Sequence, residues 1–376
     1  MTPVIKVLII LGTRPEAVKL APVVHELKRR PGRFRTVVCA TAQHRRMLGE
    51  FLALFEIAPD HDLDIMKPRQ SLAEVATRAL AGLDRVVRKE RPDVLLVQGD
   101  TTTAFCGALA GFYHKVRVGH VEAGLRTSDK YAPYPEEVNR RLITPLADLH
   151  FAPTETARKA LLAEGVPENS IHVTGNTVID ALLWMRRKLR TRPSRLPAGL
   201  AGAMRRKRVV LVTGHRRESF GEGFRNICEA ILETAEAFPD VLFVYPVHLN
   251  PNVRGPVYAL LGRHPRVKLI EPLPYAPFIW LMSRATLLLT DSGGVQEEGP
   301  SLGKPVLVMR ETTERPEGVA AGNARLVGTT RQKIVENLAD LLQNPSRLAA
   351  MASARNPYGD GRAAKRIVGI LGREAS

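Results

Sequence analysis

The sequence of 376 residues predicts an α/β fold with two similar domains, each built on a parallel sheet that helices cover on both faces. Short apolar segments alternate with helical segments along nearly the whole chain, a rhythm typical of parallel sheets. A proline-rich and basic stretch interrupts this alternation once, and the alternation then restarts. The length also suits two domains of ordinary size better than one.

The first half of the chain is expected to form an N-terminal domain over residues 1–175. Its expected strands span residues 4–11, 34–40, 94–97, 116–121, 149–152 and 171–173. Its expected helices begin at Pro15 and Glu136 and otherwise span residues 43–55, 72–89, 105–114 and 155–164. Proline suits the start of a helix because the N–H that it lacks would have no partner there.

An interdomain connection is expected over residues 176–207, where a helix containing Trp184 gives way to a stretch with Pro193 and Pro197 and then to a basic run. The pattern restarts at Arg208, so a C-terminal domain is expected over residues 208–360. Its expected strands span residues 209–214, 241–245, 267–270, 286–290 and 306–309, and its first helix spans 224–238. A last helix within residues 361–376 is expected to pack back on the first domain.

The composition argues against several classes of protein. Hydrophobic residues make up 44% and charged residues 25% of the chain, as in ordinary globular proteins. No apolar run approaches the ~20 residues of a membrane span, and the first residues lack the layout of a signal peptide. Three widely spaced cysteines, Cys39, Cys106 and Cys228, fit neither a disulfide framework nor a metal site. We therefore expect a cytoplasmic protein that binds neither membrane nor metal.

The net charge of +17 raises the alternative of nucleic-acid binding. The excess, however, is mostly arginine spread along the chain. Its densest runs, at residues 186–188 and 205–208, contain no aromatic residues on which bases could stack. We expect instead a basic surface around a site for anionic small molecules, and no nucleic-acid partner.

Acidic residues mark the ends of two elements in the first domain. Glu122 follows an apolar strand, and Glu136 begins a helix that carries Arg140 one turn later on the same face. Ligands of open α/β sheets bind at the carboxyl ends of strands. Two carboxylates at such a place suggest acid–base chemistry, and the alternative is a helix cap with a surface ion pair.

A nucleotide site is indicated by Asp291-Ser-Gly-Gly294, which joins a buried strand to a helix in the second domain. The free N–H groups at such a helix start suit an anion, and Glu297 and Glu298 follow within reach of hydroxyl groups. The alternative is a tight turn with Ser292 as the helix cap. Neither Gly-x-Gly-x-x-Gly nor Gly-Lys-Ser/Thr occurs after a strand, which argues against an NAD enzyme and an ATPase.

Loops after strands thus supply candidate site residues in both domains, and a cleft between the domains is the expected location of the ligand. Those of the first domain are Arg14, Lys19, Asp100, Glu122 and Glu136. Those of the second domain are His215, Arg216, His248, Ser292 and Glu298.

With these residues in place, the sequence resembles the non-hydrolysing UDP-N-acetylglucosamine 2-epimerases. The motifs run in the family's order over nearly the whole chain. They are Gly12-Thr-Arg-Pro-Glu-Ala-x-Lys19, Gln98-Gly-Asp-Thr-Thr-Thr103, Gly119-His-Val-Glu-Ala-Gly-Leu-Arg126, Pro135-Glu-Glu-x-Asn-Arg140, Thr213-Gly-His-Arg-Arg-Glu218, Pro246-Val-His-Leu-Asn-Pro-Asn252, Asp291-Ser-Gly-Gly-x-Gln-Glu-Glu298 and Thr312-Thr-Glu-Arg-Pro-Glu317.

The resemblance implies a GT-B type fold, in which two Rossmann-like domains have parallel sheets that face an interdomain cleft. It implies a homodimer without redox cofactor or metal. It also implies that the protein interconverts UDP-N-acetylglucosamine (UDP-GlcNAc) and UDP-N-acetylmannosamine (UDP-ManNAc). This reaction supplies N-acetylmannosamine units (ManNAc) for cell-surface polysaccharides.

The resemblance also assigns roles to matching residues. The catalytic set would be Asp100, Glu122 and Glu136, supported by Lys19, Arg140 and His215. The residues that hold UDP would be Arg14, Phe278, Ser292, Gly293, Gly294, Glu298 and Arg315. Many bacterial members bind a second UDP-GlcNAc as an activator, and that site would use Gln43, Arg69, Arg216 and His248. Arg46 stands where some members have glutamine, so dependence on an activator stays open.

The chemistry expected from this resemblance is elimination of UDP from C1, followed by re-addition. Departure of UDP makes the C2–H acidic enough for a carboxylate to remove it, which leaves 2-acetamidoglucal. Two related enzymes remain alternatives: a glycosyltransferase of the same fold, which leaves C2 unchanged, and a hydrolysing epimerase, which releases free ManNAc and UDP.

Overall fold

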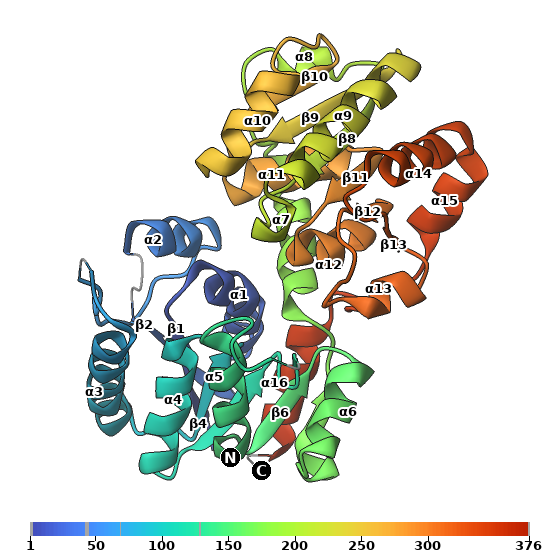
Figure 1. Cartoon of the computed structure of the whole chain (residues 1–376). Coiled ribbons are helices and arrows are strands. Elements are labelled where there is room, and N and C mark those ends of the chain that lie inside the picture. The colour runs from blue at the N-terminus through green and yellow to red at the C-terminus, as the bar shows by residue number, and fades with distance from the viewer. Residues whose placement is uncertain (1–2, 42–44, 68, 128, 375–376) are drawn as a thin grey trace. The chain divides into compact units, whose positions relative to one another are not determined.

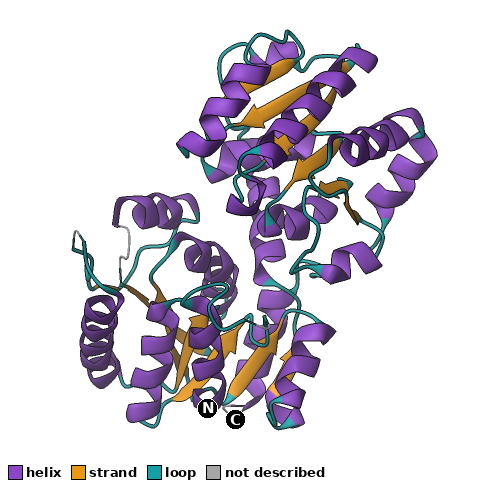
Figure 2. Ribbon diagram, viewed as in Figure 1, coloured by secondary structure: helices purple, strands orange, loops and turns teal. Residues whose placement is uncertain are grey.

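The computed structural model describes residues 3–41, 45–67, 69–127 and 129–374 (Figure 1). The chain divides into two compact units. Unit 1 comprises residues 1–181 and 358–376, and unit 2 comprises residues 182–357. Each unit is an α/β layer structure in which helices flank a sheet (Figure 2). No helix in the described part of the chain is long and apolar enough to cross a membrane.

Unit 1 contains, within the described residues, a parallel sheet with the strand order β3-β2-β1-β4-β5-β6-β7. The strands are β1 (Ile5–Leu11), β2 (Phe34–Ala40), β3 (His61–Asp62), β4 (Val94–Gln98), β5 (Arg117–Val121), β6 (Leu149–Ala152) and β7 (Ile171–Val173). This is the doubly wound order, in which the direction of winding reverses between β1 and β4.

The helices of unit 1 alternate with these strands. They are α1 (Arg14–Lys28), α2 (Arg45–Leu54), α3 (Leu72–Glu90), α4 (Thr102–Tyr113), α5 (Glu136–Ile143), α6 (Glu155–Ala163) and α16 (Ala363–Glu374), with short turns η1 (Thr144–Leu146) and η2 (Glu168–Ser170). Small residues bring α4 close to the sheet. A Cβ atom on Gly107 would lie 2.9 Å from side-chain atoms of both Ile10 and Val97, so glycine lets α4 pack directly over β1 and β4. This packing fixes the start of α4 next to the end of β4.

Unit 2 repeats the same topology, with the strand order β10-β9-β8-β11-β12-β13 in the described chain. Its strands are β8 (Arg208–Thr213), β9 (Val241–Pro246), β10 (Val267–Ile270), β11 (Leu287–Thr290), β12 (Val306–Val308) and β13 (Ala324–Leu326). Its other elements are α8 (Leu200–Ala203), η3 (Arg217–Ser219), α9 (Glu222–Ala237), α10 (Pro251–Leu261), α11 (Tyr275–Arg284), α12 (Gly293–Ser301), α13 (Pro316–Ala320), α14 (Arg331–Gln343) and α15 (Pro345–Ser353). Winding reverses between β8 and β11.

Helix α7 (Thr177–Thr191) begins in unit 1 and ends in unit 2. Its buried residue Asp180 accepts hydrogen bonds from the backbone N–H groups of Ala363 (3.1 Å) and Ala364 (3.0 Å), and so caps α16. Burial raises the pKa of Asp180 to about 6, although these hydrogen bonds act in the opposite direction. The apolar face of α16 is buried in unit 1, where the helix packs against α1. The last helix therefore completes the first unit.

The predicted strands all occur, and those at residues 34–40, 149–152, 171–173 and 267–270 have the predicted bounds. The other predicted strands and helices differ by one to three residues at their ends, except where the predicted helix at residues 43–55 begins in a part of the chain that is not described. The prediction did not include the two-residue strand β3, the strand β13, or helices such as α10, α14 and α15. The strands β3 and β13 lie at edges of the two sheets and leave the pairing of β1 with β4 and of β8 with β11 unchanged.

Candidate active site

Several candidate residues of each unit lie at the point where the winding of its sheet reverses. In unit 1, β1 and β4 are paired. Arg14 begins the helix that follows β1, and Asp100 lies in the loop after β4. In unit 2, β8 and β11 are paired, and the loops after them carry His215 and Ser292. Because the helices after two such strands go to opposite faces, a crevice opens at this position in doubly wound sheets, and ligands bind there.

A buried carboxylate shapes the first loop of unit 1. Glu16 accepts hydrogen bonds from the backbone N–H groups of Gly12 (3.0 Å) and Thr13 (2.6 Å) and from the hydroxyl group of Thr101 (2.7 Å). Burial raises its pKa, and the hydrogen bonds oppose that shift. Glu16 therefore joins the loops after β1 and β4. Its place in the capping box of α1 could have indicated this role from the sequence.

Glu122 lies at the end of β5 in a left-handed backbone conformation, with φ of 65°. Its buried carboxylate accepts hydrogen bonds from Nζ of Lys19 (2.5 and 2.6 Å), from Nδ2 of Asn176 (2.9 Å) and from the side-chain amide of Gln98. Lys19, which was predicted only as a supporting residue of the three carboxylates, thus contacts Glu122 in the structure. This carboxylate at the end of β5 therefore contacts side chains from α1, from β4 and from the segment after β7.

Gln98 and Asn176 were not among the candidate residues, although both contact Glu122. A signal was present for Gln98, which is a polar residue at the end of an apolar strand, whereas Asn176 lies three residues after β7. Both side chains are buried. A buried amide needs hydrogen-bond partners. The sequence alone, however, does not say that both amides face the same carboxylate.

Asp100 pairs with Arg140, whose Nη2 lies 2.6 Å from Oδ2 of Asp100. The one-turn spacing had suggested that Arg140 supports Glu136. The structure instead directs Arg140 to Asp100 and, at 3.4 Å, to Glu137. Glu136 is the first residue of α5 and is partly exposed, and it has no hydrogen-bond or ion-pair partner among the described residues.

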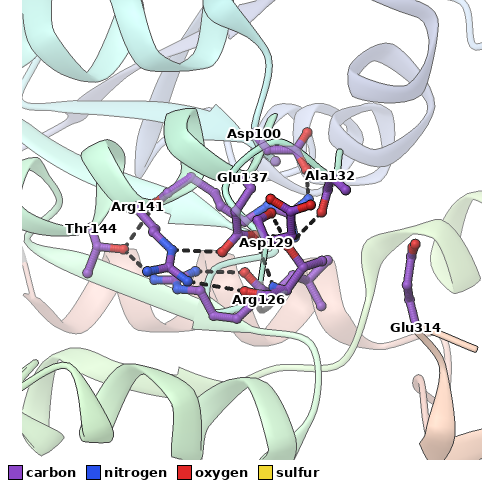
Figure 3. A network of polar contacts seen from close by, with 12 residues as sticks. Asp100, Arg126, Asp129, Ala132, Glu137, Arg141, Thr144 and Glu314 are labelled. Atoms are coloured by element: carbon purple, nitrogen blue, oxygen red, sulfur yellow. Dashed lines mark hydrogen bonds and ion pairs between the residues drawn. The ribbon is translucent and has the colours of Figure 1, made fainter. Parts of the chain in front are cut away.

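The start of α5 is held by a network of arginines and carboxylates (Figure 3). Glu137 is fully buried and accepts hydrogen bonds from Nε of Arg141 (2.7 Å) and from the backbone N–H of Thr127 (3.0 Å). Arg126 pairs with Glu164 and donates to the hydroxyl of Thr144 (2.8 Å). This network fixes the loop before α5 and the first turn that carries Glu136.

The remaining predicted residue of unit 1, Arg14, is exposed and does not join these carboxylates. Its guanidinium lies 5.4 Å from the centre of the Phe51 ring in α2. The loops of Asp100 and Glu122, by contrast, are adjacent. A Cβ atom on Gly99 would lie 3.7 Å from Oε2 of Glu122.

In unit 2, a buried aspartate holds the loop after β8 in the way that Glu16 does in unit 1. Oδ2 of Asp291 accepts hydrogen bonds from the backbone N–H groups of His215 (2.7 Å) and Arg216 (2.8 Å), and Nδ1 of His215 lies 3.1 Å from Oδ1. Burial acts to raise the pKa of Asp291, but the contacts with His215 and Arg216 lower it overall. The rings of His215 and His248 stack, with centres 5.6 Å apart.

The first turn of α12 has the features of an anion site. Ser292 occupies the N-cap position, but its hydroxyl makes no capping hydrogen bond. A Cβ atom on Gly293 would lie 3.9 Å from Nη2 of Arg315, so this guanidinium lies beside the helix start. Arg315 is held there by the buried Glu297. Free N–H groups and a neighbouring cation together favour a phosphate group.

Glu298 lies in α12, one to two turns beyond this helix start, and Phe278 lies in α11. Oε1 of the buried Glu298 accepts a hydrogen bond from the hydroxyl of Tyr275 (3.0 Å). Burial, together with the neighbouring charge of Glu298, raises the pKa of Tyr275 well above its ordinary value. Tyr275 and Phe278 lie three residues apart in α11, so they share a face of that helix. Tyr275 was not among the candidate residues.

Of the four residues predicted for the activator site, the structure brings Arg216 and His248 close to a common neighbour. Gln43 lies outside the described residues. Arg69 is exposed, with φ of 58°. Arg216 and His248 both adjoin His215. Arg216 follows His215 in the chain, and the ring of His248 stacks on the ring of His215. Nε of Arg216 is buried without a hydrogen-bond partner among the described residues.

Acidic, histidine and cysteine side chains do not form a metal site in the described part of the chain, where no group of three or more could hold an ion. The three cysteines are buried and free.

Two doubly wound units with polar loops at their switch points define a two-domain α/β protein of the GT-B type, and the expected fold class is confirmed. The family profile described as UDP-N-acetylglucosamine 2-epimerase matches residues 25–372. The chain belongs to this family.

Individual relatives agree with that assignment. The UDP-N-acetylglucosamine 2-epimerase of Escherichia coli K12 is 56% identical over 369 residues, which cover 97% of this chain and 98% of the relative. The crystal structure of the Neisseria meningitidis enzyme bound to UDP-GlcNAc is 50% identical, with a TM-score of 0.85, and the match covers 98% of this chain and 99% of that one. The Methanocaldococcus jannaschii enzyme in complex with UDP-GlcNAc and UDP is 35% identical, with a TM-score of 0.77 and coverage of 98% and 99%.

Proposed function

We propose that this protein catalyses the reversible C2 epimerisation of UDP-GlcNAc to UDP-ManNAc by elimination and re-addition of UDP. The observation that carries the proposal is the set of carboxylates in unit 1. Asp100 and Glu122 lie on adjacent loops, each paired with a cation, and Glu136 begins the helix that supplies Arg140. Membership of the epimerase family and the UDP-GlcNAc bound by the Neisseria meningitidis relative support the choice of substrate.

Unit 2 would bind the UDP part of the substrate. The start of α12, at Ser292, Gly293 and Gly294, would accept the diphosphate, with Arg315 beside it. Glu298 would accept hydrogen bonds from the ribose hydroxyl groups, and Phe278 would contact the uridine. N–H donors and cations at this position stabilise the negative charge that grows on the diphosphate as the C1–O bond breaks.

In the proposed reaction, UDP leaves C1 with the electron pair of the C1–O bond, and a carboxylate takes the proton from C2. The electrons of the C2–H bond form the double bond of 2-acetamidoglucal. Protonation of C2 from the opposite face and return of a diphosphate oxygen to C1 give UDP-ManNAc. Positioned carboxylates contribute to such proton transfers by factors of about 10²–10⁴.

The contacts of the three carboxylates suggest different roles. Glu122 accepts hydrogen bonds from Lys19, Gln98 and Asn176 and has the least capacity left to take up a proton. We infer that Glu122 orients Lys19 and fixes the charge of the site. Proton transfer at C2 is assigned to Glu136 and Asp100, since Glu136 has no partner among the described residues and Asp100 is partly exposed.

Other parts of the proposal concern assembly and regulation. A homodimer would cover an apolar surface on unit 1, where Phe112, Tyr113 and Leu142 are exposed at the ends of α4 and α5. A second UDP-GlcNAc would bind as an activator at Gln43, Arg69, Arg216 and His248. The three free cysteines suit the reducing cytoplasm. The product would supply ManNAc units for cell-surface polysaccharide.

Nuclear magnetic resonance of UDP-GlcNAc with the protein in heavy water tests the function. We expect UDP-ManNAc to form and both epimers to carry deuterium at C2, because the abstracted proton exchanges with solvent. Retention of the original hydrogen at C2 would contradict elimination. Accumulation of free ManNAc with UDP would identify a hydrolysing enzyme, and an unchanged C2 would favour a glycosyltransferase.

The Glu298→Gln variant should bind UDP more weakly by about 1–3 kcal/mol, the scale of a hydrogen bond to a charged acceptor. Calorimetric titration with UDP measures this loss. Tyr275→Phe is the matched control, because it removes one hydrogen bond to Glu298 and leaves the carboxylate in place. Equal UDP affinity for Glu298→Gln and the natural chain would remove Glu298 from the nucleotide site.

A further inference from the structure

His120 is a fully buried polar residue of β5 that none of the assigned roles uses. It lies two residues before Glu122, and its Nε2 is 2.7 Å from the carbonyl oxygen of Gly99, the residue before Asp100. Its Nδ1 has no hydrogen-bond partner among the described residues. Gly99 is also held by its own N–H group, which donates to the carbonyl oxygen of Val121 (3.0 Å). Both polar groups of Gly99 are thus bound to β5.

The state of this ring follows from its surroundings. Burial lowers the pKa of His120 to about 3, and the hydrogen bond with Gly99 only partly opposes the shift. The ring is therefore neutral at ordinary pH. Because the carbonyl oxygen can only accept, Nε2 carries the hydrogen and donates it. Nδ1 is then a buried acceptor without a partner, which costs stability. An aliphatic residue would avoid that cost, so the hydrogen bond to Gly99 is what the histidine contributes.

We propose that His120 is a positioning residue that fixes Asp100 relative to Glu122. The proposal rests on the proposed function, because it assigns His120 a role in the carboxylate site. The ring of His120 joins β5, the strand that precedes Glu122, to the peptide of Gly99, which precedes Asp100. Gly99 has φ of 71°, a left-handed conformation that the loop must keep in order to direct Asp100 toward Arg140. A displacement of about 1 Å in a catalytic group can reduce the rate by about 100-fold.

The test compares His120→Gln with His120→Asn. Both are neutral amides of similar polarity, but the glutamine amide reaches the position of Nε2, and the shorter asparagine amide reaches only that of Nδ1. We expect His120→Gln to keep kcat within about threefold of the natural value and His120→Asn to lose about 10- to 100-fold in kcat. KM and the affinity for UDP should change little in both variants.

His150 supplies a control in the same environment. It pairs in register with His120 across β5 and β6, is buried, has an unpartnered Nδ1, and has a pKa lowered to about 4 by burial. Its hydrogen bond goes to the backbone of Ala147 rather than to the loop of Asp100. His150→Asn should therefore lower the melting temperature about as much as His120→Asn and leave kcat within about threefold of the natural value.

Hydrogen exchange of the peptide that contains residues 99–103 tests the same contact without activity. The amides should exchange faster in His120→Asn than in the natural chain, His120→Gln or His150→Asn. Equal kcat for His120→Gln and His120→Asn, or equal exchange in all variants, would overturn the proposal. If the natural chain did not epimerise UDP-GlcNAc, the proposed function would fail, and the exchange would still decide whether His120 holds the loop.

Discussion

The Glu136→Gln variant is expected to turn over UDP-GlcNAc at least about 100-fold more slowly than the natural chain, and Asp100→Asn and Glu122→Gln should be similarly slow. Each substitution keeps the shape of the side chain. Asp100→Asn and Glu136→Gln remove a group that transfers a proton, and Glu122→Gln removes the charge that orients Lys19. The affinity for UDP should stay near its natural value, because the residues proposed to bind the nucleotide belong to unit 2. Steady-state rates and calorimetric titration with UDP measure the two effects separately.

The control for Glu136 is Glu155→Gln. Glu155 is the first residue of α6, as Glu136 is of α5, and its side chain is 66% exposed. Both substitutions remove a carboxylate that interacts favourably with a helix amino end, so loss of helix stability alone would affect both variants alike. Near-normal turnover in any one of the three carboxylate variants would exclude that residue from the catalytic set.

Glu122→Gln should differ from the other two variants in stability. The natural carboxylate accepts hydrogen bonds from Lys19, Gln98 and Asn176, whereas a glutamine amide would present a donor to at least one of these donors. Lys19 would also lose its counter-charge. We therefore expect a lower melting temperature for Glu122→Gln than for Glu136→Gln, whose carboxylate has no partner among the described residues.

Removal of residues 363–376 should prevent unit 1 from folding. The buried face of α16 includes Ile367, Val368, Ile370 and Leu371. Burial of each such side chain stabilises by about 1.5–3 kcal/mol, so their sum of roughly 6–12 kcal/mol matches the ~5–15 kcal/mol of a typical domain. Truncation would also expose the apolar surface of α1. We expect an aggregating chain, as measured by its soluble yield and by its circular dichroism.

A pair of point variants distinguishes loss of this packing from loss of chain length. Ile367 is fully buried, and Lys365 on the same helix is exposed. Ile367→Asp should destabilise unit 1 strongly, because it buries a charge without a partner. Lys365→Asp, the control, should leave the unfolding transition nearly unchanged. A soluble, cooperatively folded truncation product would show that α16 is dispensable for unit 1.

The sheets could be predicted from the sequence because central strands such as β1, β4, β8 and β11 are mostly apolar segments between polar loops. The segments from Val94 to Gln98 and from Leu149 to Ala152 are buried throughout, so composition and length alone identify them. The helices that were not predicted in unit 2 carry weaker signals. Helix α10, for example, contains Gly255 and Pro256, which are unusual inside a helix.

The sequence could predict where in the fold the candidate site residues lie, but not which side chains contact one another. A residue after a buried strand in a parallel sheet lies at the carboxyl edge, so Asp100, Glu122, His215 and Ser292 could be placed there. The partner of each side chain depends on contacts between residues far apart in the chain. Asn176 contacts Glu122 across 54 positions, and Arg140 bonds Asp100 across 40. Spacing along one helix had suggested Glu136 for Arg140 instead.

The two-segment construction of unit 1 has a consequence for how the chain is made. Domains usually fold in the order in which they are synthesised, yet unit 2 is complete at residue 357, before α16 exists. The unit that is begun first is therefore finished last. Ile5 and Gly372 both contact Arg33. The N–H of Ile5 donates to the carbonyl oxygen of Arg33, and the side chain of Arg33 donates to the carbonyl oxygen of Gly372. Segments that lie so close can be joined by a linker, and a permuted chain opened between the units would make unit 1 from a single uninterrupted segment.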